Sequence, residues 1–308
     1  MSDEHSTAHI VQSLAVNLVI TAAKGVAAFY TGSGAMLAET LHTFADCGNQ
    51  ILLLLGVRRA KRPPDTAHPL GYGRALYFWS FMVALLLFLG GGVFSIYEGV
   101  HKLLEPEPIE RVGIAVGILA FSLLLEGGST ISNIREINKR RGTKPFFRYL
   151  RETKDSDLIV ILGENSAASV GLVVALGALG AAHATHDSRW DSAGSIGIGL
   201  ILVGVALFLA VEVKSLLLGE SADPEIEAGA REIVAKHAKL IGLINIITLQ
   251  QGPGEVLVAL KVSLAPGMVS DEVCEVINAF ERDLKKRCPE VRWLFVEPDI
   301  DDAEDVAA

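Results

Sequence analysis

Six long apolar segments, separated by short polar loops, constrain this chain more than any other feature of its sequence. A helix needs about 20 apolar residues to cross the hydrocarbon of a bilayer. Because backbone groups in lipid must be hydrogen-bonded within their own segment, helices are favoured over strands. Several segments have no polar face wide enough to meet water, which disfavours a soluble six-helix bundle. The predicted membrane helices run roughly over residues 10–30, 35–57, 76–100, 112–134, 156–181 and 192–217.

Lysine and arginine residues gather in alternate loops. They are concentrated at 58–62, after the second segment, and at 135–154, after the fourth. Basic loops stay on the cytoplasmic side, so both termini are expected in the cytoplasm. The N-terminus is acidic and lacks the basic region of a cleaved signal peptide, and no transit peptide precedes the first helix. We therefore expect a multi-pass protein of the bacterial inner membrane.

The pattern changes near residue 219, where charged and apolar residues begin to alternate as in a soluble domain. Helical and strand periodicities follow one another in the order α-β-β-α-β. The fold class predicted is a membrane all-α six-helix domain, residues 1–218, followed by a small α+β domain, residues 219–308. The net charge of −9 argues against a nucleic-acid partner. Three cysteines without a CxxC pair give no support to a disulfide framework or thiolate metal site.

The second apolar segment carries four polar residues at helical spacing. Glu39, His42, Asp46 and Asn49 are separated by three, four and three positions, so they share one helix face. Ionisable groups are costly inside a membrane and mark a functional site by default. Imidazole and carboxylate together suit divalent metals, zinc among them. His42 and Asp46 are therefore the first candidate metal ligands, and a buried structural pair is the alternative.

A second helix must supply the remaining ligands. The fifth segment offers Glu164 and Asn165 a few residues inside its apolar run. The fourth segment offers Glu126, either as a ligand or as a structural partner of a neighbouring helix or a basic loop residue. Asp65 and His68, in the loop before the third segment, are candidates for a second, weaker metal site or belong to an ordinary structural loop.

These residues resemble the cation diffusion facilitator family. The resemblance covers about residues 10 to 300 and extends to the order of the two domains. Glu126 in Leu125-Glu126-Gly127 and Glu164 in Gly163-Glu164-Asn165 are similar to the zinc-transporter-nine-like branch. The motifs that carry the family resemblance are Asn17, Lys24, Thr31-Gly32-Ser33, Ala38-Glu39, His42, Asp46 and Asn49-Gln50, then His68-Pro69-Leu70-Gly71-Tyr72-Gly73-Arg74, Ile96-Tyr97-Glu98-Gly99 and Leu216-Leu217-Leu218-Gly219-Glu220.

The resemblance implies a transporter of divalent cations, usually zinc, that exchanges metal for protons. It also implies a homodimer paired through its cytoplasmic domains, and a four-ligand site between helices two and five. His42 and Asp46 match the helix-two ligands. In helix five, Asn165 stands where the family has an aspartate and Ile161 where it has that residue's partner. Glu164 lies one residue before Asn165, about 100° round the helix.

The expected function is divalent cation efflux, of zinc by preference, in exchange for protons. The expected partners are lipid, the metal ion, protons and a second copy of the chain, and no cofactor is held permanently. One alternative is a metal-sensing or regulatory membrane protein with a degenerate site. A membrane hydrolase is a further alternative, but no nucleophile or phosphate-binding motif supports an enzyme. The ligand types do not choose among zinc, iron, manganese, cobalt and nickel.

Overall fold

A computed structural model describes residues 2–106, 109, 111–152 and 156–299 of the chain. The chain divides into two compact units. The first consists of Met1–Arg58, Tyr77–Arg151 and Asp155–Lys214, and is helical. The second consists of Arg59–Leu76, Glu152–Lys154 and Ser215–Ala308, and it contains the sheet.

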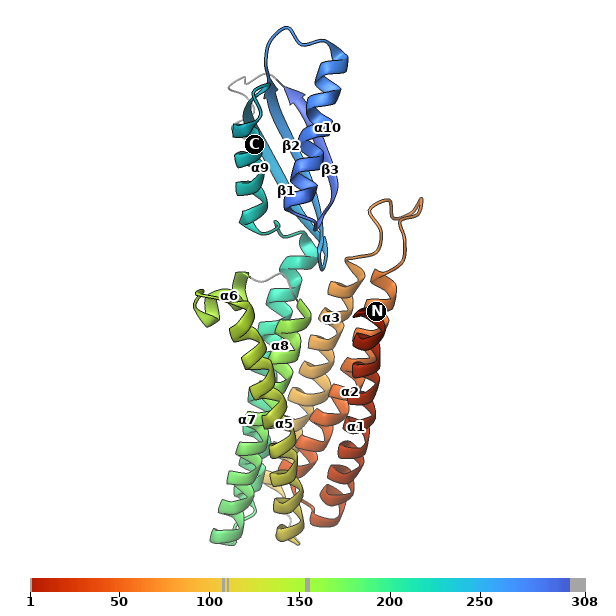
Figure 1. Cartoon of the computed structure of the whole chain (residues 1–308). Helices are drawn as coiled ribbons and strands as arrows, with labels where there is room; N and C mark the ends of the chain where they lie inside the picture. Colours follow the sequence, from red (N-terminus) through yellow and green to blue (C-terminus); the bar gives the residue numbers. More distant parts are fainter. Residues whose placement is uncertain (1, 107–108, 110, 153–155, 300–308) are drawn as a thin grey trace. The chain divides into compact units, whose positions relative to one another are not determined.

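Long helices lying alongside one another make up the first unit (Figure 1). Between α3 and α4 the helix widens into a π-helical turn, η1, at Leu87–Val93, a segment that contains three consecutive glycines. A short helix, α6, lies between the two longer helices α5 and α7 in sequence. The bounds are α1 Ser2–Thr31, α2 Gly34–Ala60, α3 Ala75–Leu86, α4 Phe94–Leu104, α5 Val112–Arg140, α6 Phe146–Glu152, α7 Ser156–Thr185 and α8 Arg189–Leu218.

Four helical segments in the described part of the chain are long and apolar enough to cross a membrane. They are Ala75–Leu104, which joins α3, η1 and α4, and then Val112–Arg140, Leu158–Thr185 and Arg189–Leu218. The apolar runs predicted from the third segment onward therefore fall on helices of membrane-spanning length. Several of these helices continue past the apolar run, as α5 does to Arg140.

The helices approach closely where glycines face a neighbour. A Cβ atom added to Gly92 would lie 2.7 Å from the side chain of Val203 on α8. A Cβ added to Gly99 on α4 would lie 2.9 Å from the backbone nitrogen of Ile196, also on α8. Real Cβ atoms essentially never come within 3.0 Å of another heavy atom. Small residues therefore permit this helix contact, as is common in membrane bundles.

A carboxylate from another helix caps the N-terminus of α2. Asp191 of α8 accepts hydrogen bonds from the backbone nitrogens of Gly34, at 2.5 Å, and Ala35, at 3.4 Å. It also accepts one from the hydroxyl of Ser33 at 2.6 Å. The first N–H groups of a helix have no partner within the helix, and the helix dipole favours a negative charge there. Asp191 thus fixes the start of the helix that carries His42.

The second unit is an α+β domain with a three-stranded sheet in the order β1-β2-β3. Strands β1 and β2 form an antiparallel hairpin, whereas β2 and β3 are parallel and are joined through α10. This matches the order α-β-β-α-β expected from the sequence. The bounds are α9 Pro224–Lys236, β1 Leu240–Gly252, β2 Glu255–Leu264, α10 Ser270–Arg287 and β3 Val291–Asp299.

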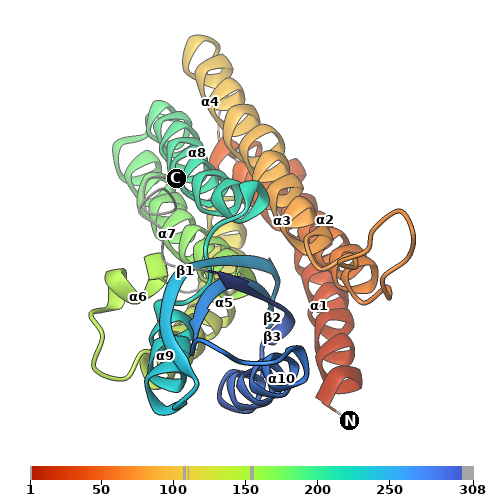
Figure 2. The ribbon, with the colours of Figure 1, turned by 90° about the horizontal axis from the view of Figure 1, so that it is seen from above.

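Both helices of this unit pack on the same face of the sheet (Figure 2). Alternation along β2 turns every second residue to this face, where the residues are buried. The core that results contains Ile226, Ala230, Ile233 and Val234 of α9, Val276, Phe280 and Leu284 of α10, and Val256, Val258, Leu260 and Val262 of β2. The other face of the sheet is covered by neither α9 nor α10.

The loop between α2 and α3 belongs to this second unit and packs against the β1–β2 turn. A Cβ atom added to Gly73 would lie 2.6 Å from the backbone oxygen of Gln251. A Cβ added to Gly252 would lie 2.8 Å from the Cα of Gly73. The two backbones therefore meet without room for a side chain on either glycine.

Candidate metal site

His42 and Asp46 lie one turn apart on α2, as their spacing predicted. The His42 side chain is fully buried, and its Nε2 lies 3.7 Å from Oδ2 of Asp46. Among the described residues, neither ring nitrogen of His42 nor Oδ1 of Asp46 has a hydrogen-bond partner. Buried polar atoms are normally hydrogen-bonded, so such a group of unpaired atoms calls for an explanation. Metal-ligating atoms are one class that fits.

Glu164 of α7 faces the same part of α2. The amide nitrogen of Asn49 donates a hydrogen bond to Oε1 of Glu164 at 2.5 Å, and both side chains are buried. Asn49 lies three residues after Asp46 on α2, so Glu164 contacts the helix turn that follows Asp46. The structure therefore brings the predicted helix-five carboxylate to the helix that carries the histidine and the aspartate.

Asn165 faces α5 instead. Its Nδ2 donates to the hydroxyl of Ser129 at 3.5 Å, and its backbone oxygen accepts from the hydroxyl of Thr130 at 2.9 Å. One residue along a helix turns the side chain by about 100°. Glu164 and Asn165 thus serve different helix contacts, and Glu164 is the one that lies beside α2.

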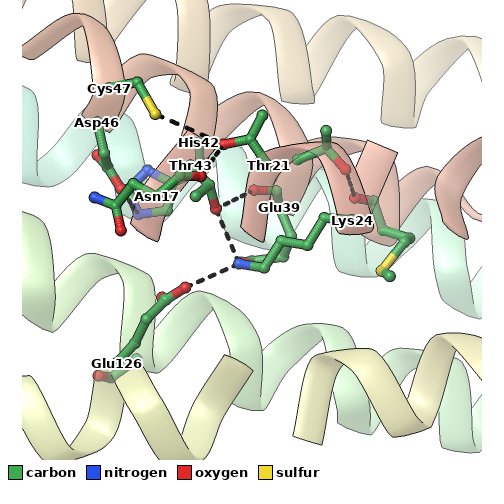
Figure 3. Close-up of polar contacts among 12 residues, drawn as sticks. Asn17, Thr21, Lys24, Glu39, His42, Thr43, Asp46, Cys47 and Glu126 are labelled. Carbon is green, nitrogen blue, oxygen red and sulfur yellow. Dashed lines mark hydrogen bonds and ion pairs between the residues drawn. The ribbon is translucent and has the colours of Figure 1, made fainter. Parts of the chain in front are cut away.

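Glu126 and Glu39 meet at a buried lysine, Lys24, whose pairing the sequence did not predict. Lys24 of α1 donates hydrogen bonds to Glu126 of α5 at 3.0 Å and to Glu39 of α2 at 3.4 Å. Figure 3 shows Lys24 between the two helices, with Thr43 as a third partner. Glu126 is therefore paired with a neighbouring helix, which is the structural role considered from the sequence.

The burial of Glu39 depends on a glycine of α7. A Cβ atom added to Gly171 would lie 2.5 Å from Oε1 of Glu39. The absence of a side chain at this position lets α7 pass directly over the Glu39 carboxylate. Because α7 also carries Glu164, this contact helps to fix the position of Glu164 along the axis of α2.

The three candidate ligands are neighbours but are not assembled around one point. In the described ranges, no group of three or more histidine, cysteine, aspartate or glutamate side chains is placed so that it could hold a metal ion. Glu164 is engaged by Asn49, and the His42–Asp46 separation exceeds a hydrogen bond. Binding of an ion at this place therefore requires the side chains to converge.

Asp65 and His68 form an ordered turn in the exposed loop before α3. The Asp65 carboxylate accepts from the backbone nitrogens of Ala67 and His68, at 2.9 and 2.7 Å, and from the hydroxyl of Tyr72 at 2.7 Å. The Tyr72 hydroxyl, followed by these backbone groups, lowers the pKa of Asp65. The ring of His68 packs against that of Tyr72, with centroids 4.2 Å apart. Asp65 is thus occupied by the structure of the loop.

Two contacts of buried charged residues were not predicted from the sequence. Lys24 is a lone charge in an apolar run, and such a residue needs a partner inside a membrane. Asp191 begins the last apolar segment, and its pairing with the start of α2 depends on tertiary structure alone.

Comparison with known proteins gives a family match over the helical part of the chain. The Cation efflux transmembrane domain family matches residues 10–218. The human "Proton-coupled zinc antiporter SLC30A9, mitochondrial" is 30% identical over 313 residues, which cover 89% of this chain and 55% of that protein. Its Xenopus laevis counterpart is 36% identical over 218 residues, covering 70% of this chain and 39% of the relative. The chain thus spans about half the length, or less, of these curated relatives.

A bacterial relative is matched over more of its length. The "Cation-efflux pump FieF" of Pectobacterium atrosepticum is 25% identical over 283 residues, covering 91% of this chain and 88% of the relative. Among solved structures, the nickel form of the MamM C-terminal domain aligns with 25% of this chain at 12% identity and a TM-score of 0.24. The family comprises transporters rather than enzymes, and the chain is a multi-pass integral membrane protein. The match over 10–218, together with the resemblance of its motifs, shows that the chain belongs to the cation efflux family.

Proposed function

We propose that this protein exports a divalent cation, zinc by preference, in exchange for protons. The observation that carries the proposal is the buried His42–Asp46 pair on α2, with Glu164 of α7 facing it. The names of the relatives support it, since they describe a proton-coupled zinc antiporter and a cation-efflux pump. Nitrogen and carboxylate oxygen are suitable zinc ligands.

His42, Asp46 and Glu164 would bind the ion from the cytoplasmic side, and rocking of the helices would then expose it outward. Glu164 is preferred over Asn165 because Asn165 contacts α5. Ligands must be deprotonated to bind metal, so protons compete for the same groups. Imidazole changes charge near neutral pH, which makes His42 the natural proton carrier.

We include α1 and α2 among the membrane spans, which gives six. Each of them carries polar side chains that are buried inside the bundle, such as Lys24 of α1 and Glu39 of α2. Residues 1–218 would form the transport domain and residues 219–308 the cytoplasmic domain. The basic loops support cytoplasmic termini. The membrane proposed is the bacterial inner membrane.

The cytoplasmic domain would pair two copies of the chain. The sheet face opposite α9 and α10 carries apolar side chains, among which Ile247 is 60% exposed and Phe295 58% exposed. Trp293 lies beside Leu257 on the neighbouring strand of this face. Exposed apolar patches of this kind mark interaction surfaces. Phe295→Glu is expected to convert a dimer into monomers in analytical ultracentrifugation, and Val269→Glu, at an exposed apolar residue before α10, is the matched control.

The transport proposal is tested in liposomes that contain purified protein and an internal zinc-sensitive dye. A pH gradient is imposed, and both zinc entry and proton movement are recorded. Asp46→Ala is expected to abolish saturable uptake, whereas Asp271→Ala, at an exposed position in the first turn of α10, retains it. Wild-type uptake in the Asp46 variant would remove this site from the mechanism.

A metal-sensing protein is the second candidate. The departure at helix five favours it, since Asn165 and Ile161 stand in place of the pair that the family has there. The liposome experiment separates the two functions. A sensor binds zinc with the same residues but gives no saturable flux under any gradient.

A further inference from the structure

A lysine inside the helical unit occupies a place where carboxylates converge. The Lys24 side chain is fully buried. Its ammonium lies 3.4 Å from Oε2 of Glu39, 3.0 Å from Oε1 of Glu126 and 2.9 Å from the hydroxyl of Thr43. Three helices, α1, α2 and α5, thus meet at one positive charge (Figure 3).

Each of the two carboxylates has an oxygen atom that does not bond to Lys24. Across the described residues, Oε1 of Glu39 and Oε2 of Glu126 have no hydrogen-bond partner. The side chain of Glu39 is fully buried, whereas that of Glu126 is 17% exposed, so the cluster reaches the edge of the bundle. Two carboxylates on facing helices, each with an oxygen that has no partner, form an arrangement that suits a cation. The cation found there is the ammonium group of Lys24 on α1.

This cluster adjoins the candidate metal site on the same helix. Glu39 precedes His42 by three residues, and Lys24 donates a hydrogen bond to Thr43, the residue after His42. An ion that enters toward His42 and Asp46 therefore meets a second set of carboxylates close by. Without Lys24, the charge of Glu39 and Glu126 would attract a divalent cation.

We propose that Lys24 is a positioning residue that keeps the transported dication out of the Glu39–Glu126 carboxylate pair and confines it to His42, Asp46 and Glu164. The tethered ammonium neutralises part of the charge and holds the free oxygens apart. A zinc ion bound between Glu39 and Glu126 would stay there and would not be transported. This inference rests on the proposed function, because it assumes that the neighbouring site binds the cargo.

The test counts zinc ions bound per chain by equilibrium dialysis of the purified full-length protein in detergent. Lys24→Gln removes the charge while keeping a hydrogen-bonding side chain, and it is expected to bind one more zinc ion per chain than the wild type. Lys24→Arg keeps the charge and is expected to bind no additional ion. Adding Glu39→Gln and Glu126→Gln to Lys24→Gln removes the new ligands and should restore the wild-type number.

Liposome uptake gives a second readout. In Lys24→Gln the trapped ion should lower the maximal rate of zinc uptake more than it changes the KM. A role in helix packing alone would not add a bound ion. Equal zinc numbers in Lys24→Gln and the wild type would overturn the inference. Absence of zinc from the wild type would instead overturn the proposed function, while an ion gained on Lys24→Gln would still support the role of Lys24.

A further variant keeps the inference testable if Lys24→Gln does not fold. Glu39→Gln combined with Glu126→Gln leaves the Lys24 ammonium without counter-charges, so it should repel a dication at His42 and Asp46. Zinc affinity is expected to fall by roughly tenfold or more, as Coulomb repulsion in a medium of intermediate dielectric predicts. Unchanged affinity would contradict a charge-based role for Lys24.

Discussion

The hydrogen bond between Asn49 and Glu164 gives the sharpest test of how α2 and α7 hold the candidate site. Asn49 is fully buried, and its amide nitrogen donates to Glu164 at 2.5 Å. Asn49→Ala removes the donor and leaves the Glu164 carboxylate without the group that fixes its orientation. Because Glu164 has a second oxygen, it can accept from Asn49 and bind an ion at the same time.

The magnitude follows from the charge on the acceptor. A hydrogen bond to a charged group contributes about 1.5–3 kcal/mol. Removing a group that orients a metal ligand typically weakens metal affinity by about 10–100-fold. That loss of affinity corresponds to a similar range of free energy as the hydrogen bond. Asn49→Ala should therefore weaken zinc binding by about 10–100-fold and raise the KM of uptake correspondingly.

Equilibrium zinc binding and liposome uptake measure this effect. Asn133→Ala is the matched control, since it removes an asparagine of α5 whose buried amide nitrogen has no hydrogen-bond partner in the described structure. The control should bind zinc like the wild type. If Asn49→Ala also behaved like the wild type, Asn49 would not orient a ligand. Tighter binding would mean that Asn49 competes with the ion for Glu164.

Three further predictions concern the surrounding structure. Asp191→Ala removes the cap of α2 and should lower the free energy of unfolding by about 1–2 kcal/mol, measured by denaturant titration in detergent. Gly73→Ala places a Cβ 2.6 Å from a backbone oxygen and should speed hydrogen exchange in the β1–β2 turn, whereas Gly113→Ala, with no atom within 4 Å, should not. Asp65 has a lowered pKa, so its stabilisation of the loop is complete above the ordinary aspartate pKa and is lost as pH falls through the folded-state value. Tyr72→Phe should raise that pKa in an NMR titration, and an unchanged value would exclude the Tyr72 hydrogen bond as its main cause.

Local patterns predicted the long helices of the first part and the order of elements in the second, but not the short helix α6 or the π-helical turn η1. In lipid, a single apolar run of about 20 residues can form all its backbone hydrogen bonds internally only as a helix. Alternation of β-branched residues identified β1 and β2. The α2 face could be predicted for the same reason, since helical spacing alone places His42 and Asp46 one turn apart. These features depend on residues close together in sequence.

Contacts between distant residues could not be predicted in this way. Helical geometry puts Glu164 and Asn165 about 100° apart but does not say which of them faces α2. That choice depends on how α7 is rotated against α2 and α5, and Gly171, packed over Glu39, contributes to it. The pairing of Lys24 with Glu126 likewise joins residues 102 positions apart.

The most direct test of the proposed site is zinc binding to single alanine variants of its three ligands. Equilibrium dialysis of purified protein is carried out on His42→Ala, Asp46→Ala and Glu164→Ala, with Asn165→Ala as the neighbouring control. Loss of the bound zinc ion from all three variants, with wild-type binding in Asn165→Ala, is the expected result. Retention of zinc by Glu164→Ala together with its loss from Asn165→Ala would contradict the site described.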